Sequence, residues 1–350
     1  MSPENDQVRL GFIGCGSHST ANLYPCLRWA KEIDFIATCD LKEELAKRNA
    51  RMFGAERWYT DYQKMLREES LDAVMIGGPP QMHSELGISC LEQDVHVFVE
   101  KPPAISAAEA KEFLHVSRRT GKHVMVAFMK RFATGYRMAK QITENHEFGR
   151  PVQIETKFAN GPYGALWGLE SPVKSFLIGQ IVHHFDLVRY YMGDAEEVYA
   201  RKAEIAENKY AISVLIKFRS SSLGLMNNNS CESWMRQNER VEIAGDEHFV
   251  VVDNVCRLLY YPKRNWIEPS GYQVYNLATF WEPNSTVPAQ ANHSHYLMGY
   301  FGEIEHFAKS LVAGSDPKPD IEDGLKALQL AEAVWKSVNT DEKVKVEDLA

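Results

Sequence analysis

The sequence predicts an α/β protein, in which an amino-terminal Rossmann domain with a doubly wound parallel sheet precedes an α+β domain with a large, open, mainly antiparallel sheet. Three observations carry this prediction. A short apolar run, Val8–Ile13, leads through a glycine-bearing loop into a stretch with helical spacing. Apolar strands and helical stretches then alternate as far as Phe128. Beyond residue 152, most segments alternate apolar and polar residues, which is typical of antiparallel strands with one wet face.

Length, charge and cysteine usage narrow the class of protein. The 350 residues exceed one typical domain, and we expect two, covering residues 1–127 and 128–350. A net charge of −8 without a Lys/Arg-rich run argues against nucleic acid and anionic membrane as partners. The polar first residues and the lack of a long apolar run predict a cytoplasmic protein. Six scattered cysteines without a C-x-x-C pair predict reduced thiols.

The loop after the first strand carries a dinucleotide-binding pattern with one departure. Gly14 permits the tight turn, and Gly16 lets the backbone approach a pyrophosphate at the positive end of the following helix. Ser19 stands where the pattern has its third glycine, but serine is small enough for close helix–strand packing. On its own this pattern is equally compatible with an ordinary tight turn.

The next strand, residues 34–40, strengthens the nucleotide interpretation. It ends in Asp40, a little over 20 residues beyond the loop, where a Rossmann unit places the acid that binds the adenosine ribose. Asp40 can also serve as a helix N-cap, and both roles are compatible. Because a carboxylate repels a 2′-phosphate, we expect NAD rather than NADP, with Lys42 as the one feature that could compensate.

The remaining elements of the first domain follow in order. We expect helices over residues 21–31, 41–53, 61–69, 83–93 and 105–120, and strands over 71–76, 96–102 and 122–128. Gly16, Asp40, residues 77–80 and Lys101 all come at the carboxyl ends of strands. Ligands bind at those ends in doubly wound sheets, so these residues should line one crevice.

The second domain is expected to combine helices with one large sheet. Helices are predicted over residues 131–145, 178–192, 296–313 and 324–338, and a long loop or lid over 266–294. Strands are predicted over residues 152–158, 197–205, 211–218, 222–229, 240–245, 248–254 and 257–262.

Several motifs together resemble one known family. They are GFIGCGSHS from Gly11, EKP at Glu100, FMKRF at Phe128, HHFDL at His183 and PDIEDGL near the end. The chain is similar to the Gfo/Idh/MocA oxidoreductases, named for glucose–fructose oxidoreductase, inositol dehydrogenase and a rhizopine-catabolism protein. The resemblance implies a nicotinamide cofactor, a sugar, cyclitol or related polyol substrate, and a homodimer or homotetramer joined through the open sheet. It also implies that Lys101 lies beside the nicotinamide and substrate, and that His183 is the catalytic histidine.

These patterns and the resemblance give two sets of candidate residues. Those for the cofactor are Gly14, Gly16, Ser17, His18, Asp40, Gly77, Pro79, His83, Glu100 and Lys101. Those for the substrate are Lys101, Arg131, Gln180, His183 and His184, with Lys101 and His183 catalytic.

The expected chemistry is the oxidation of a secondary alcohol. It needs a base for the hydroxyl proton, and an imidazole with a pKa near neutrality suits that task. A lysine can stabilise the developing oxyanion. His183 and His184 point about 100° apart on a helix, so only one can face a cleft squarely. Asp186 lies on nearly the same face as His183, and the family register favours His183 as the base.

One departure from the family affects the substrate and the function. Many members carry an aspartate four residues before the catalytic histidine, where this chain has Gly179. Without that carboxylate, a nucleotide-binding sensor of the same fold is an alternative to the leading hypothesis of a dehydrogenase. A third hypothesis is glycoside cleavage assisted by a tightly held NAD.

Two further groups of residues have both a functional and a structural interpretation. His293, His295, Glu303, Glu305 and His306 include an H-x-H pair, but a loop position and a wet helix face favour no metal site. The aromatic residues Tyr163, Trp167 and Trp234 can stack on a sugar ring or belong to the core, and the sequence leaves both open.

Overall fold

A computed structural model describes residues 7–169, 171–235, 238–263, 278–284, 286 and 289–346, without the side chain of Asn292. The predicted lid, residues 266–294, is therefore described only in part, because residues 266–277, 285, 287 and 288 lie outside the described residues. The chain divides into two compact units. The first unit comprises Met1–Met129 and Gly299–Leu328, and the second comprises Lys130–Met298 and Gln329–Ala350.

The first unit is built on a six-stranded parallel sheet with the order β3-β2-β1-β4-β5-β6. This order is that of a Rossmann fold and confirms the predicted fold class. Arg57–Tyr59, a three-residue edge strand, was not predicted because it is too short to show a periodicity. The strands are β1 (Val8–Ile13), β2 (Ile33–Cys39), β3 (Arg57–Tyr59), β4 (Ala73–Ile76), β5 (His96–Glu100) and β6 (Val124–Ala127).

Two helices of this unit illustrate how the sequence sets a helix start and a helix end. Ser106 accepts a hydrogen bond from the Glu109 amide at the start of α5, and Gly54 ends α2 in the left-handed region at φ +87°. The helical elements are η1 (Ser19–Leu23), α1 (Tyr24–Leu27), α2 (Glu43–Phe53), α3 (Tyr62–Glu68), η2 (Pro80–Met82), α4 (His83–Glu92), α5 (Ala107–Thr120) and α10 (Tyr300–Val312).

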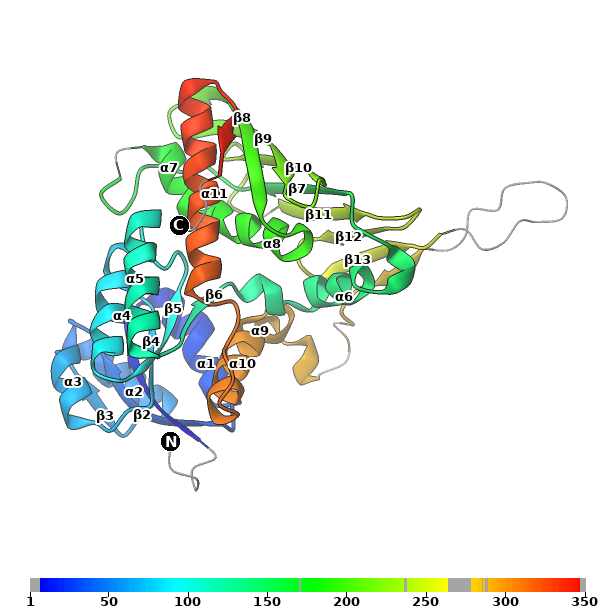
Figure 1. Ribbon diagram of the computed structural model, residues 1–350. Coiled ribbons are helices and arrows are strands. Elements are labelled where there is room, and N and C mark those ends of the chain that lie inside the picture. The colour runs from blue at the N-terminus through cyan, green and yellow to red at the C-terminus, as the bar shows by residue number, and fades with distance from the viewer. Residues whose placement is uncertain are drawn as a thin grey trace, which may run out of the picture. The chain divides into compact units, whose positions relative to one another are not determined.

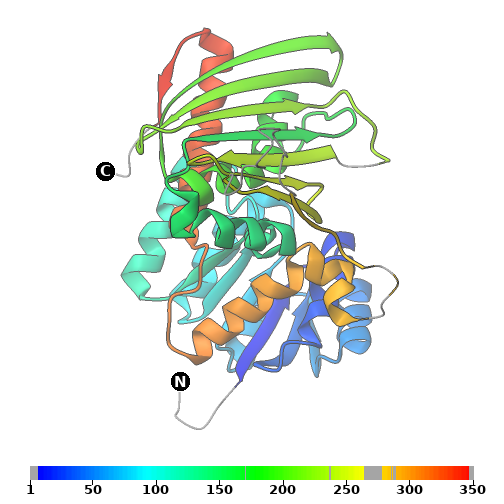
Figure 2. The ribbon, with the colours of Figure 1, turned by 90° about the vertical axis from the view of Figure 1, so that its right-hand side faces the viewer.

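The helix α10 belongs to the first unit although it is far from the other elements in sequence. It lies against β1, as Figure 2 shows, and its Phe307 ring is 5.5 Å from that of Phe98 in β5. The division at residue 127 that we expect from the sequence assigns α10 to the second domain instead. The predicted single helix 296–313 is broken by Gly299 at φ +96°, which separates α9 (Ser294–Leu297) from α10.

The second unit is built on a nine-stranded sheet with the order β14-β13-β12-β11-β7-β10-β9-β8-β15. The β7–β10 pair is parallel and the other pairs are antiparallel, so the sheet is mixed but mainly antiparallel, as predicted. The strands are β7 (Gln153–Ala159), β8 (Ala195–Ala206), β9 (Lys209–Phe218), β10 (Leu223–Asn229), β11 (Asn238–Ala244), β12 (Phe249–Asp253), β13 (Arg257–Tyr261), β14 (Thr279–Trp281) and β15 (Val344–Lys345).

Helices cover one face of this sheet. In β9, alternate residues from Tyr210 to Phe218 are buried, while Ser213 and Leu215 are exposed on the other face. The α8 helix packs on β7, and α6 packs on β12 and β13. The helical elements are η3 (Met129–Phe132), α6 (Thr134–Thr143), η4 (His146–Phe148), α7 (Pro172–Phe176), η5 (Leu177–Ile181), α8 (Val182–Met192), η6 (Gln290–Asn292) and α9, with α11 (Ile321–Thr340) shared by both units.

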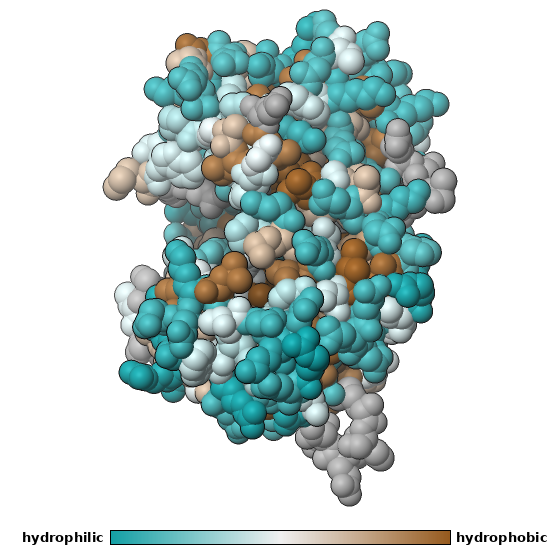
Figure 3. All heavy atoms as spheres, turned by 90° about the vertical axis from the view of Figure 1, so that its left-hand side faces the viewer, coloured by the Kyte–Doolittle hydropathy of each residue, from teal (hydrophilic) through white to brown (hydrophobic). Residues whose placement is uncertain are grey.

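One face of the described surface is largely polar. The face shown in Figure 3 is hydrophilic over most of its area, with apolar side chains in separate patches. Within the described ranges, no helix has both the length and the apolar character needed to cross a bilayer.

Candidate functional site

The glycine loop after β1 is packed against the end of β4. Gly14 adopts φ +102°, and a Cβ at this position would lie 2.0 Å from the Gly77 carbonyl oxygen, so only glycine fits. Ser19, at the third position of the pattern, donates its hydroxyl to the same carbonyl at 3.1 Å. The serine therefore ties the loop helix to the β4 turn, a contact that glycine could not make.

Asp40 holds the glycine loop through backbone hydrogen bonds. Its Oδ2 accepts the Cys15 amide and its Oδ1 accepts the Lys42 amide, each at 2.8 Å. A carboxylate offers about four acceptor positions, so two remain for ribose hydroxyls. The Arg48 guanidinium donates to the Cys15 carbonyl at 2.9 Å and to Thr20 Oγ1 at 3.0 Å, which braces the loop from the other side.

The exposed backbone of this region fits a dinucleotide. Added Cβ atoms at Gly16 and Gly78 would meet no atom within 4 Å, so both residues border open space. Ser17, His18 and Pro79 are exposed beside them. Helix amides in the first turn have no intrahelical acceptor, and they can bind a pyrophosphate that approaches Gly16. The residues that would hold the cofactor are therefore together at one edge of the sheet.

Glu100 and Lys101 lie at the same edge, at the end of β5. Glu100 is 6% exposed, and its Oε1 lies 3.2 Å from His18 Nε2 on the glycine-loop helix. Its Oε2 accepts the Lys101 amide at 3.1 Å. Burial would raise the pKa of Glu100, but His18 and Lys101 hold it below its usual range. The EKP turn is thus fixed beside the start of the cofactor loop.

His83 joins two of the turns at this edge. It is buried, and its Nδ1 and Nε2 each lie 2.8 Å from a carbonyl oxygen, of Pro102 and Gly78 respectively. Burial lowers the pKa of His83, which favours the neutral ring. A neutral ring that donates from Nδ1 to the Pro102 carbonyl can accept the Gly78 amide at Nε2, 3.4 Å away. The geometry gives His83 a role in holding the EKP turn against the β4 turn, and a direct contact with the cofactor stays a prediction.

Glu303, which the sequence analysis placed on a wet helix face, is instead buried next to this turn. Glu303 on α10 is fully buried, and neither of its oxygens has a hydrogen-bond partner among the described residues. Burial and the nearby Glu100 raise the pKa of Glu303 well above its usual range, which favours the protonated form. Tyr300, on the same helix, has its ring 6.0 Å from that of His18. Tertiary packing alone places α10 beside the EKP turn, and no pattern in the sequence predicts that position.

The candidate catalytic helix of the second unit begins after a π-helical turn. The π turn, Leu177–Ile181, contains Gly179 and Gln180 and leads into α8, where His183 is the second residue. A second π turn, Ser19–Leu23, follows the glycine loop in the first unit. π turns are rare and concentrate at functional sites, and these two stand at the two predicted sites.

The structure separates the two adjacent histidines. His184 is fully buried, with its ring 5.4 Å from the Phe158 ring of β7. Burial and Lys130 lower the pKa of His184, which disfavours the charged ring. His183 is 8% exposed, and its side chain leaves the helix about 100° from that of His184. Substrate contact by His184 stays a prediction, and its burial favours a structural part.

Below His184 lies a buried ionic network that was also missed. Lys130 and Glu239, each 2% exposed, form an ion pair, and Tyr136 donates its hydroxyl to Glu239 at 2.6 Å. His184 Nε2 lies 4.0 Å from Glu239 Oε1. Burial would raise the pKa of Glu239, but Lys130 and His184 hold it well below its usual range. The network spans η3, α6, α8 and β11 and fixes the helix that carries His183.

Arg131 and Gln180 both have partners within the second unit. Arg131 donates from Nε to Asp186 Oδ2 at 2.8 Å and pairs with Oδ1 through Nη2, a bidentate contact. The Gln180 side chain hydrogen-bonds the Tyr163 hydroxyl. Asp186 therefore serves Arg131, and a role of Arg131 or Gln180 in substrate binding stays a prediction.

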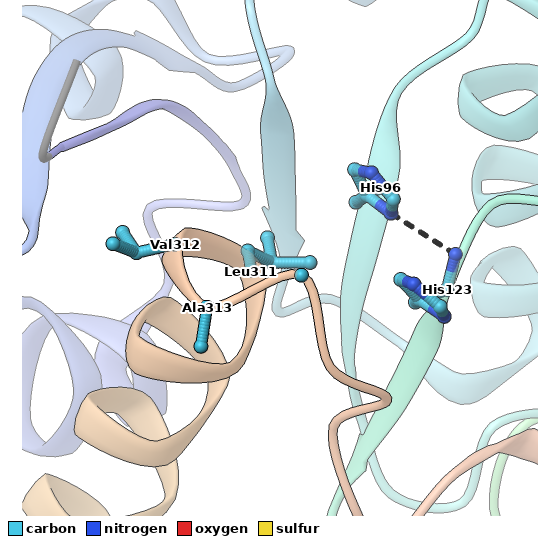
Figure 4. Close-up of a pocket in the computed structure, with 6 residues that line it drawn as sticks. His96, His123, Leu311, Val312 and Ala313 are labelled. Carbon is cyan, nitrogen blue, oxygen red and sulfur yellow. Dashed lines mark hydrogen bonds between the residues drawn. The ribbon is translucent and has the colours of Figure 1, made fainter. Parts of the chain in front are cut away.

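A pocket of about 370 Å³ lies at the opposite edge of the six-stranded sheet (Figure 4). His96 begins β5, and His123 precedes β6, so the pocket is at the amino ends of the strands and away from the glycine loop. The His123 amide donates to His96 Nδ1 at 3.0 Å, and burial lowers the pKa of His96 to about 4. These imidazoles are structural groups of the strand ends.

The histidines weighed as metal ligands lie on different elements. His293 and His295 stack with ring centres 4.8 Å apart, and Glu303 and His306 are on α10. In the part of the chain that the structure describes, no three His, Cys, Asp or Glu side chains are grouped so as to hold a metal ion.

Comparison with known proteins agrees with this architecture. The chain is 25% identical over 351 residues to the myo-inositol 2-dehydrogenase of Thermotoga maritima, covering 98% of this chain and 99% of that protein. It is 29% identical over 192 residues to the scyllo-inositol 2-dehydrogenase (NAD(+)) of Bacillus subtilis, covering 53% and 54% of the two chains.

Solved structures show the same fold. A dehydrogenase from Chromobacterium violaceum superposes with a TM-score of 0.87 at 23% identity over 96% of both chains. A levoglucosan dehydrogenase in complex with NADH and levoglucosan superposes with a TM-score of 0.85 at 19% identity, over 98% of this chain and all of that one. Residues 8–128 match the NAD-binding Rossmann fold of an oxidoreductase family, and residues 140–346 match its C-terminal α/β domain. The protein therefore belongs to the Gfo/Idh/MocA oxidoreductase family.

Proposed function

We propose that the protein is an NAD-dependent dehydrogenase that oxidises a secondary hydroxyl of a sugar, cyclitol or related polyol. The observation that carries the proposal is the contact between His18 and Glu100, which fixes Lys101 at the edge where the glycine loop would hold a dinucleotide. A lysine at that place can act on a substrate that lies against the nicotinamide. The similarity to inositol dehydrogenases and to a levoglucosan dehydrogenase supports a ring-shaped polyol as the substrate.

Each catalytic residue has one proposed task. NAD⁺, when bound, supplies the acceptor for the hydride that leaves the carbinol carbon. The imidazole of His183 takes the hydroxyl proton, which suits a group that titrates near neutrality. The ammonium of Lys101 stabilises the negative charge that develops on the substrate oxygen. Asp186, three residues after His183 on α8, acts indirectly because its carboxylate holds the Arg131 guanidinium.

We propose NAD rather than NADP as the cofactor. Asp40 lies at the end of β2, and its carboxylate would meet a 2′-phosphate at close range. The Arg48 guanidinium nearby is already hydrogen-bonded to the loop through Cys15 and Thr20. The proposed preference for NAD therefore rests on the Asp40 carboxylate.

A substrate panel tests the proposed function. Purified protein is mixed with NAD⁺ and inositols, pyranoses, anhydrosugars or open-chain polyols, and absorbance in the reduced-nicotinamide band is followed. Net formation of NADH with at least one substrate supports a dehydrogenase. If NADH binds but no substrate gives net turnover, the sensor hypothesis replaces it. Release of an aglycone from a glycoside without net NADH formation would instead indicate NAD-assisted glycoside cleavage.

We also propose that the protein is a homodimer or homotetramer that buries the exposed face of the nine-stranded sheet. On this face Leu215 of β9 lies opposite Leu225 of β10, and Leu215 and Leu223 are each about half exposed. Apolar side chains gathered on a sheet face favour a covered surface. Light scattering at micromolar concentration tests it, and a monomer would contradict it.

A further inference from the structure

Gly179 provides the space for an indole ring. A Cβ at this position would lie 2.2 Å from Trp167 Cη2 and 2.6 Å from its Cζ3. It would also lie 2.8 Å from the Tyr163 hydroxyl oxygen. Cβ contacts below 3.0 Å essentially never occur, so no other residue fits here while Trp167 keeps its place. The glycine in the π turn and the indole over it are therefore one structural feature.

The backbone of Trp167 is held in an unusual conformation to make this contact. Trp167 adopts φ +56° and is followed by Gly168 at φ +75°. The left-handed region is unfavourable for a bulky residue, and such outliers persist only where the surrounding structure holds them. Trp167 nonetheless keeps part of its surface exposed, so the indole is not simply a core residue.

A second indole is seated on a second glycine close by. A Cβ at Gly161 would lie 2.1 Å from Trp234 Cδ1. The Trp234 ring is 6.4 Å from the ring of Tyr163, which also borders the Trp167 site, and Trp234 is 59% exposed. Tyr163, Trp167 and Trp234 thus form one aromatic wall, with Tyr163 in the middle.

Gly179, on which the aromatic wall is seated, lies one helical turn before the candidate catalytic histidine. Gly179 lies in the π turn that runs directly into α8, and His183 follows four residues later. Residues four positions apart are neighbours on the surface of a helical run, so Gly179 and His183 lie on one side of it. The indole over Gly179 is therefore presented on the side of the helix that carries His183.

Resting on the dehydrogenase function proposed above, we propose that Trp167, seated on Gly179, is a specificity-determining residue whose indole face stacks on a C–H face of the substrate ring. The negative face of an aromatic ring attracts the weakly positive C–H hydrogens of a pyranose or cyclitol. An open-chain polyol offers no flat C–H face and loses more rotamer freedom when it is ordered. The wall therefore selects ring-shaped polyols over open-chain polyols of equal size.

The test compares two variants of Trp167 with a matched tryptophan control. Dissociation constants of scyllo-inositol, methyl β-D-glucopyranoside and sorbitol are measured by titration calorimetry on the NADH-loaded enzyme, with KM and kcat for whichever is oxidised. Trp167→Ala should weaken binding of the two ring compounds about tenfold. Binding of sorbitol should change less than about twofold, and Trp167→Phe should retain most of the ring affinity. Trp58→Ala, which removes a partly exposed indole in the first unit, should leave all three constants unchanged.

Gly179→Ala is the second variant and does not depend on the folding of Trp167→Ala. Its Cβ must displace the indole, so it should show the same selective loss of ring affinity. Equal weakening of ring and open-chain ligands by Trp167→Ala, or no weakening of either, would overturn the stacking proposal.

The outcomes separate this proposal from the proposed function. Net turnover of a ring substrate with no dependence on Trp167 would refute the stacking role and leave the dehydrogenase intact. Binding of ring compounds that depends on Trp167, without any net turnover, would refute the dehydrogenase and leave the stacking role intact.

Discussion

Replacing Lys130 by methionine should destabilise the second unit far more than the loss of a surface ion pair would. The side chains of Lys130 and Glu239 are 3% and 2% exposed, and Tyr136 donates to the same carboxylate. Methionine keeps the length of the side chain but removes its charge. Glu239 is then left buried with a single strong donor, and its charge has no counterion.

The expected magnitude follows from that burial. Removing one partner of a buried pair costs about 3–5 kcal/mol, against about 0–1 kcal/mol for an exposed pair. For a domain of about 150–250 residues this corresponds to a fall in Tm of roughly 6–20 °C. Because burial is what makes the lone charge costly, a double variant with Glu239→Gln should recover most of the loss. Lys202→Met, which breaks an exposed pair with Glu204, is the matched control.

The assay is thermal and urea unfolding of the single and double variants, repeated across acidic pH. In the wild type, the folded-state pKa of Glu239 lies below its unfolded value, despite burial, because of Lys130 and His184. Its stabilisation is therefore complete above the unfolded pKa of about 4.3 and is lost as pH falls below that value. Glu239→Gln should lack this acid-side loss.

Two results would refute this reasoning. A loss for Lys130→Met as small as that for Lys202→Met would show that the pair is not held in a low-dielectric interior. Strict additivity of the two single losses in the double variant would show that the charges do not interact.

Four further predictions follow from the site. His183→Ala should lower kcat by about 100- to 10,000-fold with NAD affinity nearly unchanged, whereas His184→Ala should mainly lower Tm. Steady-state kinetics and melting curves check this prediction. The reverse pattern would identify His184 as the base. Lys101→Ala should lower kcat and weaken substrate binding, measured on the same panel. Asp40→Ala should narrow the preference for NAD over NADP by more than about tenfold in calorimetric titrations, and an unchanged ratio would contradict the ribose assignment. Burial and nearby Glu100 raise the folded-state pKa of Glu303. The free energy of unfolding of the wild type should therefore fall as pH rises from the unfolded-state pKa of about 4.3 towards the folded-state pKa. In Glu303→Gln, which cannot ionise, that decline should disappear from the unfolding free energy.

Much of the fold could be predicted because it depends on local patterns. The strand periodicities, the cap at Ser106 and the helix end at Gly54 are set by residues within a few positions of each other. The glycine loop and Asp40 were placed at one edge because parallel strands share their carboxyl ends. The hydrogen bonds from the Cys15 and Lys42 amides to Asp40 agree with that placement.

Other features depend on contacts between residues that are far apart in sequence. The break at Gly299 and the packing of α10 in the first unit bring Glu303 beside Glu100. The hydrogen bond from Ser19 to Gly77, and the contacts of His83 with two turns, likewise could be identified only in the folded structure. The spacing of apolar residues along the chain does not predict such pairs of distant residues, because it indicates only which face of a helix or strand is buried.

The sequence by itself determined the family, the order of strands and helices, and the chemical types available at the site. It identified two adjacent histidines and a glycine at position 179, but left their roles to the family register. Only the tertiary structure decided that His184 is fully buried over β7, and that Trp167 fills the space over Gly179. The physical reason is that close packing between distant segments, rather than local spacing, determines which side chain is desolvated and which remains at the surface.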